Sequence, residues 1–399
     1  MRRTVVLCAL VAASPLKAVA QGASERSLDS LITRAAADVN DPTAHYNLAM
    51  GFWDKKRWDE AEKELHTAVT IAPAYAEAYL ALSALPKAKG EKYWKKRLKA
   101  EGQEAVRAVF VESNSHYRQA FLLNPLVDLG VLGKFEAEDR VTFRVNGRYL
   151  IALVPPWWSD EVEKGINDFR QARYDTAFDR FQKVIADRRI GGDTLAPMPV
   201  LWYHGLAAAH LANFDTAVRD FAVLTGRGVA IEKARSEPDV TLPLLTNDYR
   251  YVLATMLYLG GRYDDAIPTF KRTLEIDPAL YVSHVQLARI YSAARMWDEA
   301  IRERQAAVDA NAEDADLYLE LGATLLQSGR TADAEEPLRR AAEMNPRDSR
   351  IPYLLGMVLT QLGKESEARV AFQRFLDIAP SGYADQIQEV KARLVATPQ

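Results

Sequence analysis

The sequence contains few of the residues that carry reactive chemistry. Its 399 residues include one cysteine, Cys8, and six histidines. His204 and His210 are six residues apart and fall on different faces of a helix, so a paired metal site is not expected there. The common motifs for phosphate binding, dinucleotide binding, serine hydrolysis and zinc proteolysis are all missing. These absences favour binding over catalysis, and we expect no catalytic residue, no bound metal and no cofactor.

Long hydrophobic runs are also missing, so no transmembrane segment is expected. A short apolar run at the start of the chain follows Arg2 and Arg3, and Ala18-Val19-Ala20 has the small-x-small pattern of a signal-peptidase site. We therefore expect residues 1–20 to be a signal peptide that is cleaved after Ala20. The alternative is a first buried helix. Cys8 lies inside the apolar run rather than at its end, so lipidation is not expected.

The chain that remains after this cleavage would be acidic and free of cysteine. Without Arg2, Arg3 and Lys17 it has 48 basic and 54 acidic residues, a net charge of −6. The absence of cysteine is compatible with an oxidising compartment, and no Asn-x-Ser/Thr sequon is present. We expect an exported protein that is periplasmic or associated with the cell envelope, with no nucleic-acid partner.

A repeat of 34 residues dominates the C-terminal half of the sequence. Small residues and a leucine recur in phase, and a proline closes most units: Ala266, Ala300, Ala334 and Ala368; Leu253, Leu287, Leu321 and Leu355; Ala254, Ala288, Gly322 and Gly356; Pro278, Pro346 and Pro380. This pattern resembles the tetratricopeptide repeat. The resemblance implies an all-α fold, a superhelical solenoid of helical hairpins. Within one unit, Gly260-Gly261 is expected to end the first helix, and Ala266 and Phe270 to lie on the inner face of the second.

The same phase extends over most of the chain and divides it into segments. We expect an N-terminal repeat region at 24–125 with a helical insertion at 86–112, a β-hairpin insertion at 126–157, a middle repeat pair at 158–231, a regular four-repeat array at 247–382 and a C-terminal capping helix at 383–396. An irregular link is expected at 226–245. After the insertion, Ser113–Leu123 is expected to form the second helix of the split repeat.

The hairpin is expected from a different pattern. Val141–Val145 and Arg148–Leu153 read as strands, and Asn146-Gly147 suits a type I′ turn. In this register Arg144 faces Tyr149. The hairpin could pair with a partner strand, or it could fill the gap that the broken repeat leaves.

Two sets of residues stand out as candidate binding sites. The resemblance implies that the first helix of each repeat faces an inner groove, and its equivalent positions here include Trp202, Tyr251, Tyr258, Arg289 and Tyr353. Some of these aromatic residues could instead pack between helices. The second set is a basic run in the insertion, which could meet an anionic surface or an acidic partner, or could simply be a solvated helix face: Lys92, Lys95, Lys96, Arg97 and Lys99.

The sequence therefore predicts an exported scaffold or adaptor that holds a peptide or helix segment of another protein in its groove, in envelope assembly or the organisation of a complex. The alternative is an accessory subunit of a periplasmic enzyme, or an enzyme of its own, with its site in 86–158. No group of residues in that segment indicates catalysis.

Overall fold

The computed structural model describes residues 27–124, 126, 144–145, 148–149, 160–190, 198–234 and 241–396. Two compact units divide the chain. Unit 1 consists of residues up to Ala78 together with those from His284 onward, and unit 2 of Tyr79–Ser283. The predicted signal peptide, including Cys8, lies outside the described residues.

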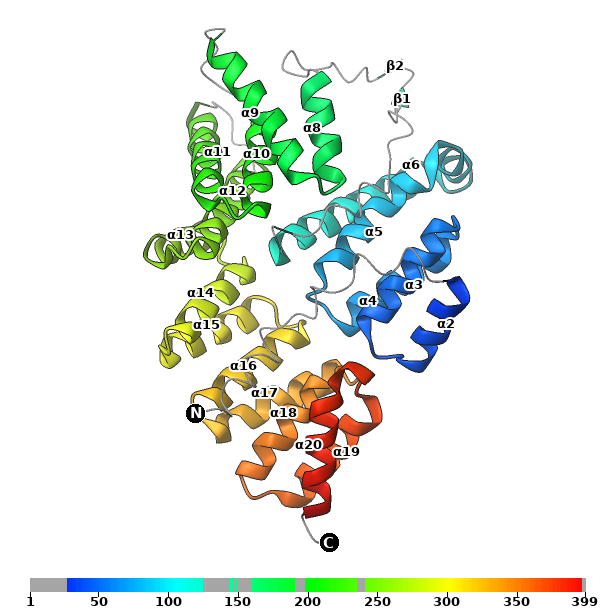
Figure 1. Ribbon diagram of the computed structural model, residues 1–399, viewed down its shortest axis with the longest axis vertical. Helices are drawn as coiled ribbons and strands as arrows, with labels where there is room; N and C mark the ends of the chain where they lie inside the picture. The colour runs from blue at the N-terminus through cyan, green and yellow to red at the C-terminus, as the bar shows by residue number, and fades with distance from the viewer. Residues whose placement is uncertain are drawn as a thin grey trace. The chain divides into compact units, whose positions relative to one another are not determined.

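The described residues are almost entirely helical (Figure 1). The helices in chain order are α2 (Leu28–Ala37), α3 (Pro42–Asp54), α4 (Trp58–Ile71), α5 (Ala76–Ala88), α6 (Gly90–Leu123), α8 (Asp160–Arg170), α9 (Tyr174–Ile190), α10 (Met198–His210), α11 (Phe214–Ala234), α12 (Thr241–Leu259), α13 (Tyr263–Ile276), α14 (Tyr281–Ala293), α15 (Trp297–Ala310), α16 (Ala315–Gln327), α17 (Thr331–Met344), α18 (Arg350–Gln361), α19 (Glu365–Ile378) and α20 (Ala384–Ala396).

Helical hairpins form where the 34-residue phase predicts them. The small residues are at the contacts between paired helices: Ala266, Ala300 and Ala334 have no exposed surface. At Gly322 an added Cβ would lie 2.6 Å from Cγ of Leu338, so the first helix can approach the second only without a side chain there. Tightly packed small residues thus account for the repeated pattern.

In seven of the described hairpins, the turn between the two helices has one left-handed residue at the same place. Glycine fills it in three hairpins, at Gly261, Gly329 and Gly363, with φ between 72° and 85°. The other four hairpins have a side chain at this left-handed position: Lys56, Ala172, Ala212 and Arg295, with φ between 56° and 59°. An L-residue in this conformation costs roughly 1–2 kcal/mol.

Unit 1 joins the two ends of the chain. The loop after α17 reaches the first hairpin, where Nδ2 of Asn345 donates to the carbonyl of Ile71 at 2.9 Å. Arg347 donates to Oδ1 of Asn40 at 3.0 Å and to the carbonyl of Val39 at 2.9 Å. The first repeat therefore packs on the last ones. At the C-terminus, α20 lies in the segment predicted as a capping helix, and its Val390 is buried.

In unit 2, α6 differs from the prediction. Its second half was expected to begin at Ser113, but helical structure runs from Gly90 to Leu123 and is interrupted only at Gly102, with φ 87° and ψ 174°. Glycine permits this extended break. Ser113 lies inside the helix, with its hydroxyl donating to the carbonyl of Ser83 on α5 at 2.6 Å. The segment 86–112 is thus helical as predicted, and only its part after Gly102 is continuous with the helix that carries Ser113.

The predicted irregular link at 226–245 is also largely helical. Helix α11 continues to Ala234 and α12 begins at Thr241. A Cβ added at Gly228 would be 2.5 Å from Oγ1 of Thr246, so the lack of a side chain at Gly228 lets α12 approach α11 closely.

In the β-hairpin region the structure describes only β1 (Arg144–Val145) and β2 (Arg148–Tyr149). They pair antiparallel, Arg144 with Tyr149 and Val145 with Arg148. The remaining positions of the predicted hairpin lie outside the described residues, so the insertion as a whole stays a prediction. Among the described helices, none has the length and apolar character needed to cross a bilayer.

Candidate functional site

The predicted groove residues fall in different units. Trp202, Tyr251 and Tyr258 belong to unit 2, and Arg289 and Tyr353 belong to unit 1. Each group is therefore considered within its own unit.

In unit 2, two of the predicted anchors are covered by the chain's own helix α6. Tyr251 has no exposed surface, and its hydroxyl donates to the carbonyl of Leu122 at 2.7 Å. The ring of Trp202 packs against Phe121, with ring centroids 5.4 Å apart. Tyr251 is therefore a core residue, so it is not an accessible anchor in this conformation. A stripe of aromatic residues cannot tell a groove from an internal contact, which is why sequence reasoning placed it on the surface.

The end of α6 makes polar contacts beside these rings. Arg118 forms a two-pronged ion pair with Asp248 on α12, at 2.9 and 3.1 Å. Gln119 donates to the hydroxyl of Tyr281 at 2.8 Å. Tyr258, at the far end of α12, is half-buried and lies beside Tyr263, with ring centroids 5.8 Å apart. Of the three unit 2 predictions, Trp202 and Tyr251 thus meet α6, and Tyr258 lies against the following helix.

In unit 1, Arg289 belongs to a chain of charges that links three helices. Its side chain on α14 is 44% exposed and lies 3.6 Å from Glu320 on α16. Glu320 is also paired with Arg304, a buried residue of α15. Burial acts to raise the pKa of Glu320, but Arg304 and Arg289 outweigh it and hold that pKa below its ordinary value. Glu320 is therefore ionised, and it fixes the exposed guanidinium of Arg289.

One turn before Glu320, α16 carries a second set of ion pairs. Asp316 pairs with Arg350 at the start of α18, and Nε of Arg350 lies 3.0 Å from each carboxylate oxygen of Asp348. Nearby, Oδ1 of Asp314 caps α16 by accepting from the amide of Asp316 at 2.9 Å. Burial, reinforced by Asp316, raises the pKa of Asp314 to about 7. Sequence reasoning named only Arg289 of this network, because its partners come from other repeats.

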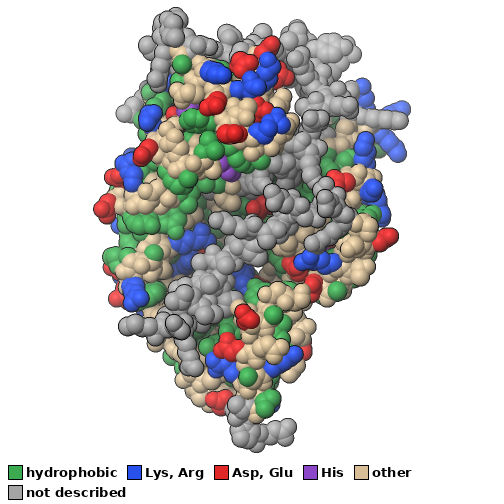
Figure 2. Space-filling model, viewed as in Figure 1, with side chains coloured by type: hydrophobic (Ala, Val, Ile, Leu, Met, Phe, Trp, Pro, Cys, Tyr) green, Lys and Arg blue, Asp and Glu red, His purple; other side chains and the backbone are tan. Residues whose placement is uncertain are grey.

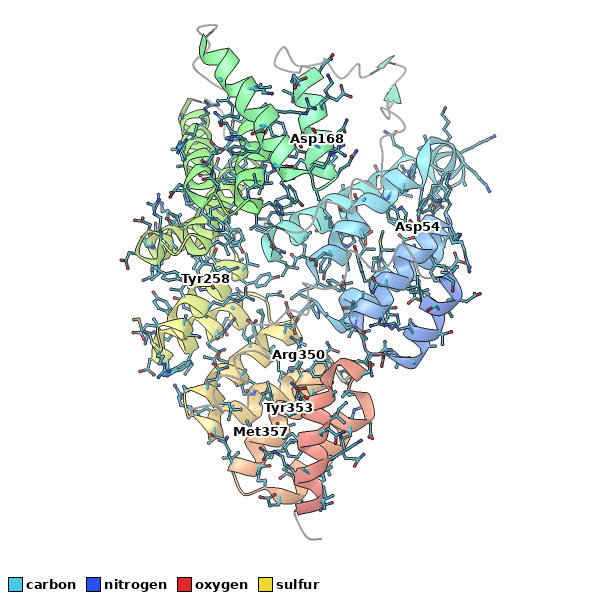
Figure 3. The ribbon with its side chains drawn as sticks, viewed as in Figure 1. Asp54, Asp168, Tyr258, Arg350, Tyr353 and Met357 are labelled. Carbon is cyan, nitrogen blue, oxygen red and sulfur yellow. The ribbon has the colours of Figure 1, made fainter. Side chains whose placement is uncertain are left out.

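Tyr353 is buried, so in this structure its side chain does not line an open groove as predicted. Its hydroxyl donates to Glu389 on α20 at 3.0 Å. Burial and Glu389 raise the pKa of Tyr353 to about 12. Figure 3 labels Arg350, Tyr353 and Met357 along α18, one of the first helices of unit 1. The capping helix covers the middle of this set.

The basic run lies on the first half of α6. Lys95, Lys96 and Lys99 are exposed, whereas Trp94 just before them is buried and donates from Nε1 to the carbonyl of Pro86 at 2.5 Å. Arg97 pairs with Glu101 at 2.7 Å. The side chain of Lys92 lies outside the described residues. Trp94 thus anchors a short helix whose outer side is basic.

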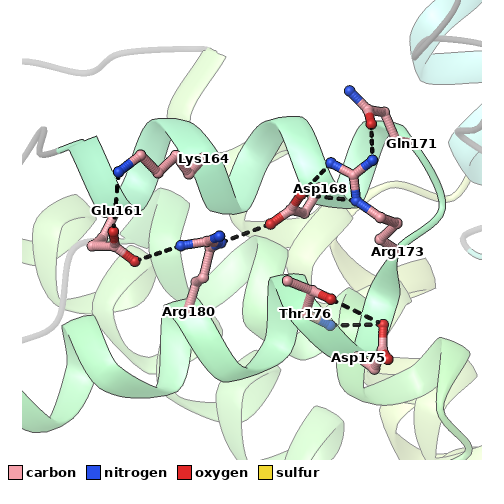
Figure 4. A network of polar contacts seen from close by, with 8 residues as sticks. All are labelled: Glu161, Lys164, Asp168, Gln171, Arg173, Asp175, Thr176 and Arg180. Atoms are coloured by element: carbon pink, nitrogen blue, oxygen red, sulfur yellow. Dashed lines mark hydrogen bonds and ion pairs between the residues drawn. The ribbon is translucent and has the colours of Figure 1, made fainter.

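A cluster of ion pairs holds α8 to α9. In Figure 2 acidic and basic side chains are mixed over α8, and Figure 4 shows their contacts. Buried Asp168 accepts from Nε of Arg173 at 3.0 Å and from Nε of Arg180 at 2.7 Å, and Arg180 reaches Glu161 at 2.8 Å. Burial acts to raise the pKa of Asp168, but these hydrogen bonds outweigh it and lower that pKa. The cluster satisfies its own charges and so acts as a clamp.

No arrangement in the described part of the chain points to catalysis or metal binding. Nowhere among these residues do three histidine, cysteine or carboxylate side chains gather closely enough to hold a metal ion. His204 contacts Asp220 at 2.6 Å, but both are buried, and His204 stacks on Phe178 with ring centroids 4.4 Å apart. This pair lies between packed helices and is closed to a substrate.

Paired helices that repeat every 34 residues, with small residues at each contact, define a helical-hairpin repeat protein. Comparison with known sequences gives the family. Models described as tetratricopeptide repeat match residues 204–280 and 324–383, and another matches residues 257–325. The chain belongs to the tetratricopeptide-repeat family, whose repeats form scaffolds for protein–protein interaction.

Individual relatives are distant. The chain is 28% identical over 142 residues to the protein O-mannosyl-transferase Tmtc1 of Drosophila melanogaster, a match over 34% of this chain and 16% of that protein. The chain thus spans about a sixth of the length of this curated relative.

Solved structures share the repeat at low identity. The C-terminal part of a TPR repeat-containing protein from Cytophaga hutchinsonii is 14% identical, covers 57% of this chain and 84% of its own length, and gives a TM-score of 0.46. YrrB, a TPR protein with an unusual peptide-binding site, is 23% identical over 40% of this chain and 77% of its own, with a TM-score of 0.33. MamA from Desulfovibrio magneticus RS-1 is 14% identical. The match covers 45% of this chain and 94% of MamA, with a TM-score of 0.36.

Proposed function

We propose that the protein is an exported scaffold that binds a peptide or helix segment of another envelope protein on the first helices of its repeats. The role is binding rather than catalysis. The observation that supports it is the exposed guanidinium of Arg289, held by Glu320 with Arg304 behind it. A cation that is fixed before binding loses little side-chain entropy when it meets a carboxylate, and arginine is a frequent hot-spot residue.

The test begins with the mature chain as bait in a pull-down from envelope extract, followed by affinity measurement with the protein obtained. Arg289→Ala is expected to weaken binding by about 1–2 kcal/mol or more. The matched control is Arg302→Ala on α15, whose side chain is 69% exposed and pairs with Glu299 of the same helix. Both variants should keep the wild-type helicity and melting temperature. Equal affinity of the two would contradict a binding surface at Arg289.

Export is the second part of the proposal, and it rests on the N-terminal residues. Intact-mass measurement of the protein from the cell envelope is expected to give a chain that begins at Gln21. A retained Met1, or a lipid adduct on Cys8, would contradict it.

The third part of the proposal is that the basic first half of α6 makes a weak contact with an anionic surface. Exposed Lys95, Lys96 and Lys99 support it. Lys95→Glu with Lys96→Glu is expected to abolish binding to vesicles that contain anionic lipid, and salt should weaken the wild-type contact. Salt-independent binding to neutral vesicles would contradict it.

A further inference from the structure

The last turn and a half of α6 docks on the first helices of later repeats in unit 2. Four successive contacts come from the five residues Arg118 to Leu122. They reach Asp248, Tyr281, Trp202 and Tyr251. Their partners are at least 129 residues away along the chain, apart from Trp202. Two of these partners, Trp202 and Tyr251, are at positions that the family uses as an inner wall, so here the chain's own helix covers them.

The chemistry of this contact suits the C-terminal end of a helix. The last carbonyls of a helix lack partners within it. Leu122 supplies one of them, because α6 ends at Leu123, and the hydroxyl of Tyr251 donates to it at 2.7 Å. Asp248 also pairs with Arg118, which lies just before the last turn of α6.

The apolar part of the contact is formed by one face of α6. Arg118, Phe121 and Leu122 have the i, i+3, i+4 spacing of a single helix face. Phe121 meets the ring of Trp202, which also lies between Phe221 at 5.3 Å and Tyr249 at 5.6 Å. The site thus contacts three features of the helix end: an arginine, an aromatic ring three residues later, and, at the next residue, a backbone carbonyl that has no partner within the helix.

Two observations separate α6 from the repeats that it covers. Its helix is broken at Gly102, between the basic first half and the docking half. The rim of the contact is also open to solvent, since the side chains of Arg118 and Asp248 are 46% and 23% exposed. The opposite side of the docking half is attached to α5 through Ser113 and Ser83. The contact with the first helices can therefore be lost while α5 keeps its partner.

We propose that unit 2 is a receptor for the C-terminal end of a helix and that residues 118–122 of α6 are its resident ligand. A partner binds by replacing them with a helix end of the same chemistry, an arginine followed three and four residues later by an aromatic and an aliphatic residue. The inference rests on the proposed function only for the class of ligand, a segment of another protein.

The test uses the full mature chain and a synthetic peptide of residues 113–123. In the wild type the resident helix competes, which lowers the apparent affinity for the peptide by the fraction of open sites. Arg118→Glu places a carboxylate against Asp248 and should open the site, so the peptide is expected to bind this variant at least about tenfold more tightly than the wild type. The matched control is Arg97→Glu, which changes an arginine on the other half of α6.

Exchanging the charges of Arg118 and Asp248 tests whether the peptide binds at this site or whether unit 2 has only become looser. Asp248→Arg should also open the site, but it should prefer a peptide that carries glutamate at the place of Arg118 and should reject the native peptide. Hydrogen exchange is expected to show faster exchange in residues 113–123 of both site variants, with the other helices of unit 2 protected as in the wild type.

Three results would overturn the proposal. One is a native peptide that binds Arg118→Glu no more tightly than the wild type. Another is a loss of protection throughout unit 2, which would make the end of α6 an inseparable part of its core. The third is unchanged exchange in α6, because the ion pair would then not hold the helix. None of them bears on Arg289, which belongs to unit 1, so the proposed function is tested separately.

Discussion

The side-chain amide of Asn345 donates to the backbone carbonyl of Ile71 over 2.9 Å, although 274 residues separate them in the sequence. Ile71 is the last residue of α4, and its carbonyl has no partner within that helix. Asn345 is 7% exposed, so the bond is made away from water. One side chain thus satisfies the end of the first hairpin and ties it to the last repeats of unit 1.

We expect Asn345→Ala to lower the free energy of unfolding by about 1–3 kcal/mol, because a buried carbonyl would lose its donor. Denaturant unfolding monitored by circular dichroism measures it. Asn311→Ala is the matched control, since Asn311 ends α15 at the same place one repeat earlier. If the two variants lost equal stability, the effect would belong to the helix end and not to the contact with Ile71.

Asp314 should make the stability of unit 1 depend on pH near neutrality. Its pKa is raised from 3.8 to about 7, so the folded chain keeps a proton that the unfolded chain releases. The free energy of unfolding should therefore fall as the pH rises from about 4 to 7. Asp314→Asn keeps a capping oxygen and should be more stable than the wild type at pH 8 by at least about 1 kcal/mol.

The control for this prediction is Asp41→Asn, which makes the same change at the cap of α3, where Oδ1 accepts from Thr43 at 2.9 Å. It should leave the slope of stability against pH as in the wild type. An Asp314→Asn variant with the wild-type slope would show that another group titrates.

Asp168 should stabilise the hairpin of α8 and α9 with the opposite dependence on pH. Because its pKa is lowered, its contribution is present above its ordinary pKa of 3.8 and is lost as the pH falls through the folded value. Asp168→Ala is expected to cost about 1.5–3 kcal/mol at pH 7, as for a hydrogen bond to a charged group. Thermal unfolding at pH 7 and at pH 3 measures both effects. Asp179→Ala, an exposed neighbour on α9, should cost far less. A deficit that did not shrink at any acid pH at which the wild type still folds would exclude a charge-based clamp.

Ala334→Leu should destabilise the regular array. Ala334 is fully buried at the contact of α16 with α17, and its carbonyl is 3.4 Å from where a Cβ at Gly322 would lie. Overpacking of this kind costs roughly 1–3 kcal/mol. Ala332→Leu, two residues earlier on the exposed side of α17, is the control. Equal melting temperatures for the two variants would mean that the phase of the repeat is wrong.

The architecture of the repeats was predictable because it depends on local spacing. Ala266 and Phe270 are buried as the 34-residue phase requires, α12 ends at Leu259 before Gly260-Gly261, and α6 ends before Asn124-Pro125. Each of these features is decided within a single hairpin, by side-chain volume or by the conformational freedom of one residue.

The candidate sites were less predictable because they depend on contacts between distant repeats. The aromatic character of Tyr251 and Tyr353 was visible in the sequence, but their contacts with α6 and α20 were not. Arg289 is exposed as a surface anchor requires, yet Arg304 and Glu320, which orient it, lie on other helices. At 226–245 the predicted irregular link was wrong for the described residues, which are helical, and Gly228 there lies at a helix contact with Thr246.

The left-handed turn residues bear on the order in which the chain folds. The hairpins of α12 with α13, α16 with α17 and α18 with α19 turn at glycine and can close without backbone strain. Those that turn at Lys56, Ala172, Ala212 and Arg295 must first gain enough packing to offset the strained residue. Repeat proteins nucleate in one place and grow outward through neighbouring repeats. We therefore expect the nucleus to form at the adjacent glycine-turn hairpins α16–α19. The C-terminal repeats, synthesised last, would then serve as the template on which the earlier ones assemble.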